Sequence, residues 1–129
     1  LINCDQDSNP LSITKSIEIV YGLRNFIGNA NKFSKSKVII NIKSDSEYTE
    51  IIIEDDGDGY PKDVLRKIGE PYISSFKSLA KSKSGLGLGI FIGKTLLEKN
   101  YANILCSNSK VRSGAEVTIK WKNKDLLSL

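Results

Sequence analysis

A strict two-residue alternation near the end of the chain constrains the fold more than any other feature. Between residues 115 and 122, apolar side chains alternate with polar ones, Val117, Ile119 and Trp121 against Glu116, Thr118 and Lys120. Successive side chains of a strand point to opposite faces, so such a strand has one buried and one exposed face. A sheet of this kind is covered on one side only, which predicts a single layer of helices packed against it.

Other periodic segments supply the remaining elements. Three- and four-residue spacing predicts a helix over 16–32, with its apolar face formed by Ile17, Val20, Leu23, Ile27 and Ala30. A second helix is expected over about 87–99, ending at Asn100, with one face formed by Leu88, Phe91, Ile92, Thr95 and Leu96. Strands are expected at 38–43, 48–54 and 103–107, the first two joined as a hairpin. Pro61 suits the first turn of a short helix over 61–68, and residues 74–84, rich in Ser and Lys, are expected to form a mobile loop.

Length and composition fit one domain spanning residues 1–129. Hydrophobic residues make up 40% and charged residues 26%, and no apolar run approaches the roughly 18 residues of a membrane span. No signal-peptide pattern opens the chain, and methionine is absent, so we expect a fragment of a longer protein. The net charge of +4 comes from scattered lysines without an aromatic-basic motif, which argues against a nucleic-acid partner.

The supply of reactive side chains excludes several kinds of chemistry. The chain has no histidine, and its two cysteines, Cys4 and Cys106, are far apart, so a zinc site lacks ligands. Ser/His and Cys/His catalysis are excluded within this segment for the same reason. We expect both cysteines to be reduced.

The first candidate site is the glycine run Gly85–Gly89, which enters the predicted second helix. Glycine lets a phosphate approach the backbone, and a helix start offers free N–H groups and a favourable dipole. The spacing fits neither GxGxxG nor a P-loop, because residues 90 and 92 are Ile and residue 88 is Leu. Tight packing of the helix on the sheet explains the glycines equally well.

Two further candidates are polar. Alternation along the strand predicts that Asp55 points inward. A buried carboxylate needs hydrogen-bond partners, and an amino group on a base could be one. Alternatively, the cluster of Asp and Gly residues suits turn capping. Asn25, Asn29 and Lys32 share one side of the first helix. An amide oxygen can ligate Mg²⁺ and a lysine can meet phosphate, although a solvated helix face would look the same.

In this order the segments resemble the ATP-binding domain of sensor histidine kinases, in the superfamily shared with gyrase, Hsp90 and MutL. The resemblance covers nearly the whole chain from about Ser16. "RNFIGNANKF" looks like the N box, "DDGDG" like a DxGxG G1 box, Pro71-Tyr72 falls at the F box, and "GLGLG" looks like the G2 box. "RKIGEPYISS", "GLGLGIFIGKTLLEKN" and "GAEVTIKW" look like the RegB/PrrB-type redox-responsive kinases.

The resemblance implies a Bergerat-type α+β fold, a two-layer sandwich with a mixed, mostly antiparallel sheet. It also implies ATP and Mg²⁺ as cofactors, with a lid over about residues 72–84. Site roles carried over by motif are the metal ligand Asn29, the phosphate contact Lys32, the adenine-reading Asp55, the supporting Asn25, the base-pocket glycines Gly57 and Gly59, the apolar walls Phe33 and Tyr72, and the phosphate cradle Gly85, Leu86, Gly87 and Leu88. Lys83 stands where many kinases begin the G2 box with glycine.

The resemblance further implies a protein-histidine kinase rather than a hydrolase. ATP-hydrolysing relatives use a glutamate base four residues before the metal-binding asparagine, and here that residue is Asn25, which cannot accept a proton. The phosphoacceptor histidine is then expected on a dimerisation domain outside this segment, with a response regulator downstream. The domain would be cytoplasmic, in an inner-membrane sensor attached to the membrane only through other segments. A non-catalytic docking module with a degenerate nucleotide pocket, or an ATPase of the same superfamily, is the alternative.

Overall fold

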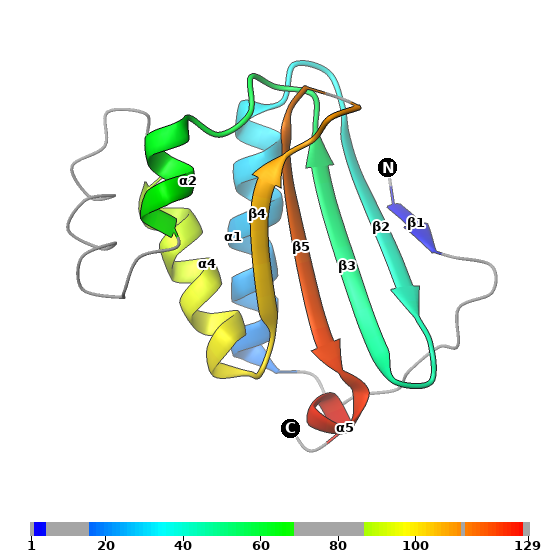
Figure 1. The fold of residues 1–129 in the computed structure, drawn as a ribbon. Coiled ribbons are helices and arrows are strands. Elements are labelled where there is room, and N and C mark those ends of the chain that lie inside the picture. The colour runs from blue at the N-terminus through cyan, green and yellow to red at the C-terminus, as the bar shows by residue number, and fades with distance from the viewer. Residues whose placement is uncertain (1, 5–15, 69–86, 112, 128–129) are drawn as a thin grey trace.

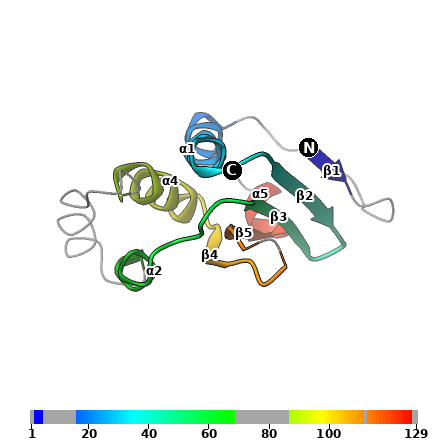
Figure 2. The ribbon, with the colours of Figure 1, turned by 90° about the horizontal axis from the view of Figure 1, so that it is seen from above.

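A computed structural model of the chain describes residues 2–4, 16–68, 87–111 and 113–127. Within these ranges five strands form one sheet. Helices α1, α2 and α4 lie along one side of it, as the view from above shows (Figures 1 and 2). The two-layer α+β arrangement predicted from the alternating strand is confirmed.

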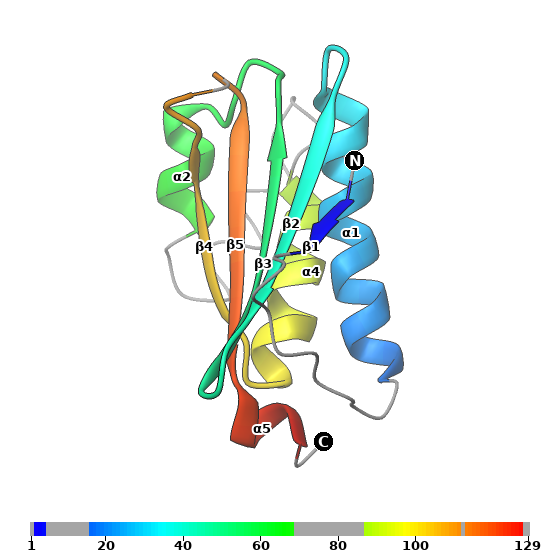
Figure 3. The same ribbon diagram turned by 90° about the vertical axis from the view of Figure 1, so that its right-hand side faces the viewer.

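The described elements follow one another as β1 (Ile2–Cys4), α1 (Ile17–Phe33), β2 (Val38–Ser44), β3 (Tyr48–Asp55), α2 (Lys62–Ile68), α4 (Gly87–Lys99), β4 (Asn103–Asn108), β5 (Ala115–Lys122) and α5 (Asn123–Leu127). The strand order is β1-β2-β3-β5-β4, which runs from right to left in Figure 3. β1 pairs in parallel with β2 and the other neighbours are antiparallel, so the sheet is mixed and mostly antiparallel as expected. The sequence patterns predicted neither β1 nor α5.

Helix α1 begins where Ser16 caps it, because the Ser16 side chain accepts the Ile19 N–H at 3.4 Å. The predicted apolar face is partly wrong. Ile17 is 69% exposed and Ile27 is 36% exposed, while the buried positions of this helix are Ile19, Gly22, Phe26 and Ala30. The buried side of α1 differs from the predicted one because α1 packs against both the sheet and α4, and Phe26, only 1% exposed, lies against Gly93 of α4.

Two glycines set the contact between α1 and α4. A Cβ on Gly22 would lie 2.6 Å from Leu97 Cγ, and a Cβ on Gly93 would lie 2.9 Å from Phe26 Cε2. The close approach buries Ile90, Phe91 and Leu97 but leaves Ile92 39% exposed, so the predicted face of the second helix is wrong at Ile92. A glycine carries no hydrophobic signal, which is why the apolar pattern alone misplaced both faces.

Helix α1 and strand β3 finish at the same end of the domain. Helix α1 runs toward that end, the upper one in Figure 1, and β3 ends there at Asp55. Lys99 Nζ pairs with Glu18 Oε2 at 2.8 Å at the opposite end, tying the last turn of α4 to the first turn of α1. Asn100 follows as the predicted stop, its Nδ2 donating to the Leu96 carbonyl at 2.9 Å.

Candidate functional site

The Asp55 carboxylate lies at the end of β3, on the face turned toward the helices. Its residue is 4% exposed, as predicted from strand alternation. Oδ1 accepts the Gly57 N–H at 2.9 Å and the Ala115 N–H at 3.2 Å. Within the described part of the chain no donor reaches Oδ2, and no buried side-chain oxygen there is left without a partner. Oδ2 is therefore the accessible acceptor of this carboxylate.

Two glycines shape the chain after Asp55. A Cβ on Gly57 would lie 2.2 Å from the Phe33 carbonyl oxygen, so this position holds the loop directly against the end of α1. Gly59 has φ +81°, a left-handed conformation that favours glycine. Both predicted base-pocket glycines are thus required by the local backbone.

A small cavity of about 60 Å³ opens beside Asp55. It is lined by Asn29, Phe33, Asp55, Asp58, Gly59, Tyr60 and Ala115. The structure therefore brings together four predicted site residues, Asn29, Phe33, Asp55 and Gly59, from α1, β3 and the loop after it. Ligand pockets usually measure roughly 300–1,000 Å³, so this cavity accommodates only part of a ligand.

The polar residues of α1 flank its buried stripe. Asn25 and Asn29 are half-buried, which sets them apart from a purely solvated helix face, while Lys32 is exposed. Asn25 Nδ2 donates to the Tyr21 carbonyl at 2.8 Å, so its amide is oriented by the helix backbone. Lys32 Nζ lies 5.3 Å from the centre of the Phe33 ring, within cation–π range.

The glycine-rich segment is described only from its helical part. α4 begins at Gly87 and continues through Leu88, as predicted for the second helix. A Cβ on Gly89 would lie 3.8 Å from Asn25 Oδ1, so the start of α4 is close to the polar side of α1. Tyr72, Gly85 and Leu86 lie outside the described residues, as do Lys83 and the expected lid over 72–84.

The other two aspartates of the motif serve the local structure. Asp56 accepts the backbone N–H groups of Lys35, Ser36 and Lys37 at 2.8–3.1 Å, closing the loop after α1. The Ser36 hydroxyl bond, followed by these N–H groups, holds the pKa of Asp56 well below its ordinary value. Asp58 pairs with Lys35 at 3.2 Å on the surface. The predicted turn-capping role is correct for Asp56.

Sequence patterns missed the contribution of the turn between β4 and β5. Asn108 bonds the backbone of Tyr60, and Ala115 donates to Asp55. Gly114 lies so close that a Cβ there would be 2.0 Å from the Asp55 carbonyl oxygen. These contacts join residues about 50–60 positions apart, and only "GAEVTIKW", noted for its resemblance to known kinases, marked this region in the sequence.

Cys106, on β4, lies next to the buried Tyr60. It is free, as expected for a reduced cysteine. Burial raises the pKa of its thiol to about 12, and burial likewise raises the pKa of the Tyr60 hydroxyl. A thiol with so high a pKa is a weak nucleophile, so Cys106 is a packing residue.

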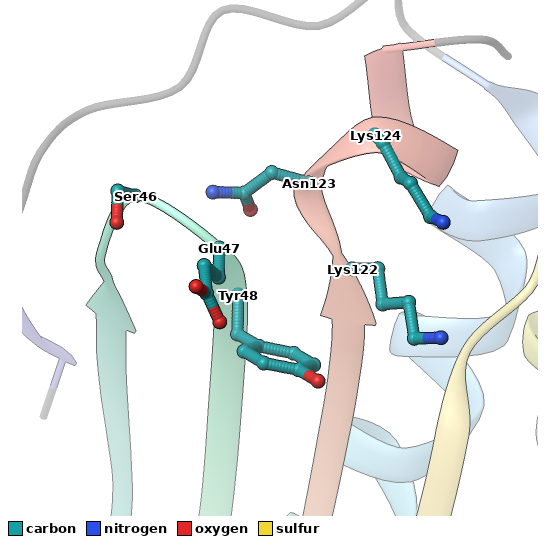
Figure 4. A pocket seen from close by; sticks show the side chains of 6 residues that line it. All are labelled: Ser46, Glu47, Tyr48, Lys122, Asn123 and Lys124. Carbon is teal, nitrogen blue, oxygen red and sulfur yellow. The ribbon is translucent and has the colours of Figure 1, made fainter.

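Larger hollows lie at the opposite end of the sheet. One of about 390 Å³ is lined by Ser46, Glu47, Tyr48, Lys122, Asn123 and Lys124 (Figure 4). The figure shows Lys122 and Lys124 pointing away from Ser46 rather than converging. The Asn123 amide already bonds the Asp45 carbonyl at 2.7 Å and the Thr49 hydroxyl at 2.7 Å, so it fastens α5 to the hairpin. Size alone does not make this hollow a site, because its Asn123 amide is bonded within the fold and its two lysines do not converge.

The class of protein is shown by the match of the chain to a known family. Residues 14–125 match the family described as histidine kinase-, DNA gyrase B- and HSP90-like ATPases, and the chain belongs to this family. Since the family binds ATP, this is a nucleotide-binding domain.

Within the family, the chain is 35% identical over 124 residues to sensor histidine kinase RegB of Cereibacter sphaeroides, covering 84% of this chain and 27% of that protein. The predicted RegB-type likeness is confirmed. The chain is also 30% identical over 86 residues to sensor protein KdpD of Clostridium acetobutylicum, covering 65% of this chain and 10% of that protein. The chain thus spans about a quarter of RegB and a tenth of KdpD.

Solved structures agree on the fold. The catalytic domain of histidine kinase ThkA in a nucleotide-free form matches with a TM-score of 0.72 and 18% identity, covering 95% of this chain and 78% of that one. Mycobacterial sensor histidine kinase MprB matches with a TM-score of 0.61 and 20% identity, covering 94% and 81%. Among the helices that the structure describes, none has the length and apolar character needed to cross a membrane.

Proposed function

We propose that this domain binds Mg²⁺-ATP and presents the γ-phosphate to a histidine on a dimerisation domain outside this segment. The observation that carries the proposal is the Asp55 carboxylate, with Oδ1 held by two backbone N–H groups and Oδ2 open beside a small cavity. An adenine amino group is a donor of the right kind for Oδ2. Phe33 would support the base as an apolar wall of the same cavity.

The metal would be held from α1. The half-buried Asn29 lines the cavity, and its amide oxygen is a suitable Mg²⁺ ligand. The described residues contain no group of three or more His, Cys, Asp or Glu that could hold a metal by themselves. This donor set fits Mg²⁺ that takes most of its ligands from phosphates and water. Such an ion supplies charge neutralisation at the phosphates.

The phosphates would extend from the cavity toward the start of α4. The first turn of that 13-residue helix would offer N–H groups and a favourable dipole to an anion, and we propose the exposed Lys32 as a further phosphate contact. Gly85, Leu86, Gly87 and Leu88 are proposed as the cradle and Tyr72 as a second apolar wall. Positioning and charge neutralisation then account for transfer without a covalent step on this domain.

Hydrolysis would be slow because Asn25 stands where a base would be needed. Its amide is bonded to the Tyr21 carbonyl and cannot accept a proton. Loss of a general base costs typically about 10²–10⁴-fold in rate. A kinase of this kind holds ATP for its partner histidine, and a response regulator would receive the phosphoryl group next. We place the domain in the cytoplasm, attached to the membrane only through other parts of a longer sensor protein.

Titration of the domain with ATP and Mg²⁺, followed by calorimetry and by phosphate release, tests the proposal. We expect ATP to bind, Asn29→Ala to weaken the Mg²⁺-dependent part of binding, and phosphate release to be very slow. A ligand at 100 times its Kd should stabilise the fold by about 2.7 kcal/mol. Absence of ATP binding would indicate a docking module. Brisk hydrolysis that Asn25→Ala leaves unchanged would indicate that the kinase assignment is wrong.

A further inference from the structure

The side chain of Asn108, at the end of β4, holds the backbone of Tyr60 by two hydrogen bonds. Asn108 Oδ1 accepts the Tyr60 N–H at 2.7 Å, and Asn108 Nδ2 donates to the Tyr60 carbonyl at 3.1 Å. A single amide thereby satisfies both backbone groups of one residue, in the manner of a neighbouring strand. The two residues are 48 positions apart, so this clamp is a tertiary contact rather than a local turn.

The clamp acts on the part of the loop that borders the cavity. Gly59 and Tyr60 both line the cavity beside Asp55, whereas Asn108 is not among its lining residues. Gly59 has φ +81°, and a Cβ there would lie 2.7 Å from Asn108 Oδ1. The left-handed turn at Gly59 therefore lies directly against the Asn108 amide, which fixes where the turn ends.

The same strand end also holds the carboxylate. Asn108 pairs with Ala115 in the register of β4 and β5, and the Ala115 N–H donates to Asp55 Oδ1. The Asn108–Ala115 pair thus holds two parts of the cavity lining: Ala115 holds the Asp55 carboxylate, and Asn108 holds the turn at Gly59 and Tyr60. A shift of Tyr60 would move Gly59 relative to Asp55 and change the shape of the space between them.

We propose that Asn108 is a positioning residue for base recognition: it sets the geometry of the Gly59–Tyr60 wall and so makes the cavity selective for adenine, without touching the nucleotide. The inference rests on the proposed function, since it concerns the base end of the same site. It differs from a purely structural role in its expected effect, because the proposed phosphate contacts at the start of α4 come from other residues.

Comparison of ATP with inorganic tripolyphosphate separates these roles. For Asn108→Ala we expect the Kd for ATP to rise about tenfold or more, which corresponds to about 1.4 kcal/mol, while the Kd for tripolyphosphate changes less than about twofold. Asn103→Ala is the matched control, because Asn103 is an exposed asparagine at the other end of the same strand and does not line the cavity. Hydrogen exchange should show faster exchange of the Tyr60 N–H in Asn108→Ala only.

A second variant covers the case in which Asn108→Ala does not fold. Asn108→Asp keeps the acceptor for the Tyr60 N–H and loses the donor to its carbonyl, and we expect it too to lose ATP affinity selectively. Equal loss of ATP and tripolyphosphate binding, or unchanged ATP binding in a folded variant, would overturn the inference. If the unmodified domain binds tripolyphosphate but not ATP, the proposed function itself fails, and this outcome is distinct because it precedes any substitution.

Discussion

Replacing Asp55 by asparagine changes one acceptor in the site and preserves the shape around it. The Asn side-chain oxygen can still accept the Gly57 and Ala115 N–H groups that Oδ1 accepts now, at 2.9 and 3.2 Å. The amide nitrogen then takes the place of Oδ2 and offers a donor where the adenine amino group needs an acceptor. We therefore expect the variant to fold and to lose base recognition.

The expected size of this loss follows from the one hydrogen bond removed. Hydrogen bonds to charged groups are worth about 1.5–3 kcal/mol, and each 1.4 kcal/mol is a factor of ten in Kd. Asp55→Asn should thus raise the Kd for ATP by about 10- to 150-fold and leave that for tripolyphosphate almost unchanged. Isothermal titration calorimetry of both ligands at a fixed Mg²⁺ concentration measures the difference directly.

Asp58→Asn is the matched control for this experiment. Asp58 also lines the cavity, but its side chain is 92% exposed and pairs with Lys35 on the surface. Asp58→Asn removes one negative charge, as Asp55→Asn does, but it leaves the buried acceptor Asp55 in place. ATP binding should therefore change little. Equal losses for ATP and tripolyphosphate in Asp55→Asn, or equal effects of the two substitutions, would refute the role given to Asp55.

Three further predictions concern the fold around the site. Gly57→Ala would place a Cβ 2.2 Å from the Phe33 carbonyl and should lower stability by about 1–3 kcal/mol, a drop of several degrees in Tm measured by thermal unfolding. The pKa of Asp56 is lowered on folding, chiefly by the Ser36 hydroxyl. The Asp56 carboxylate therefore stabilises the fold fully above its unfolded pKa of about 3.9, and this stabilisation is lost as the pH falls further. Urea unfolding of Asp56→Asn should accordingly show a smaller loss of stability in acid. Cys106, with its pKa raised to about 12, should resist thiol reagents at pH 8 until the protein is unfolded, as a colorimetric thiol assay of a Cys4→Ser variant would show.

Each of these predictions has a clear contrary result. Gly28→Ala is the control for Gly57→Ala, because nothing lies within 4 Å of a Cβ at Gly28 and alanine favours the helix there. If both alanine variants unfold at the same temperature, the close contact at Gly57 does not contribute to the stability of the folded protein. An unchanged acid transition in Asp56→Asn would mean that the loop bonds do not stabilise the fold. Rapid labelling of Cys106 in the folded protein would contradict its burial.

Local patterns predicted most of the elements but not how they contact one another. The alternation of β5 was sufficient to predict a half-covered sheet, and the inward turn of Asp55 followed from counting along β3. The faces of α1 and α4 were partly misjudged because their contact is decided by glycines, whose effect is visible only when a neighbour fills the space. β1 has three residues, too few for an alternating pattern to be recognised.

In the candidate site, too, some residues could be predicted from local sequence and others could not. Asn29, Phe33, Asp55 and Gly59 could be named from motifs, since each lies in a segment with a recognisable spacing. Asn108 gave no such signal. Its role comes from a pair of hydrogen bonds across 48 residues, and strand pairing over that distance is determined by the whole sheet rather than by nearby sequence.

The glycine contact between α1 and α4 has a consequence for building chimeric kinases from related domains. Gly22 admits Leu97, and Gly93 admits Phe26, so each helix carries the space that the other one fills. Grafting only one of them from a relative with larger residues at these positions would separate the asparagines of the first helix from the leading turn of the second. The two helices should therefore be exchanged as a single cassette.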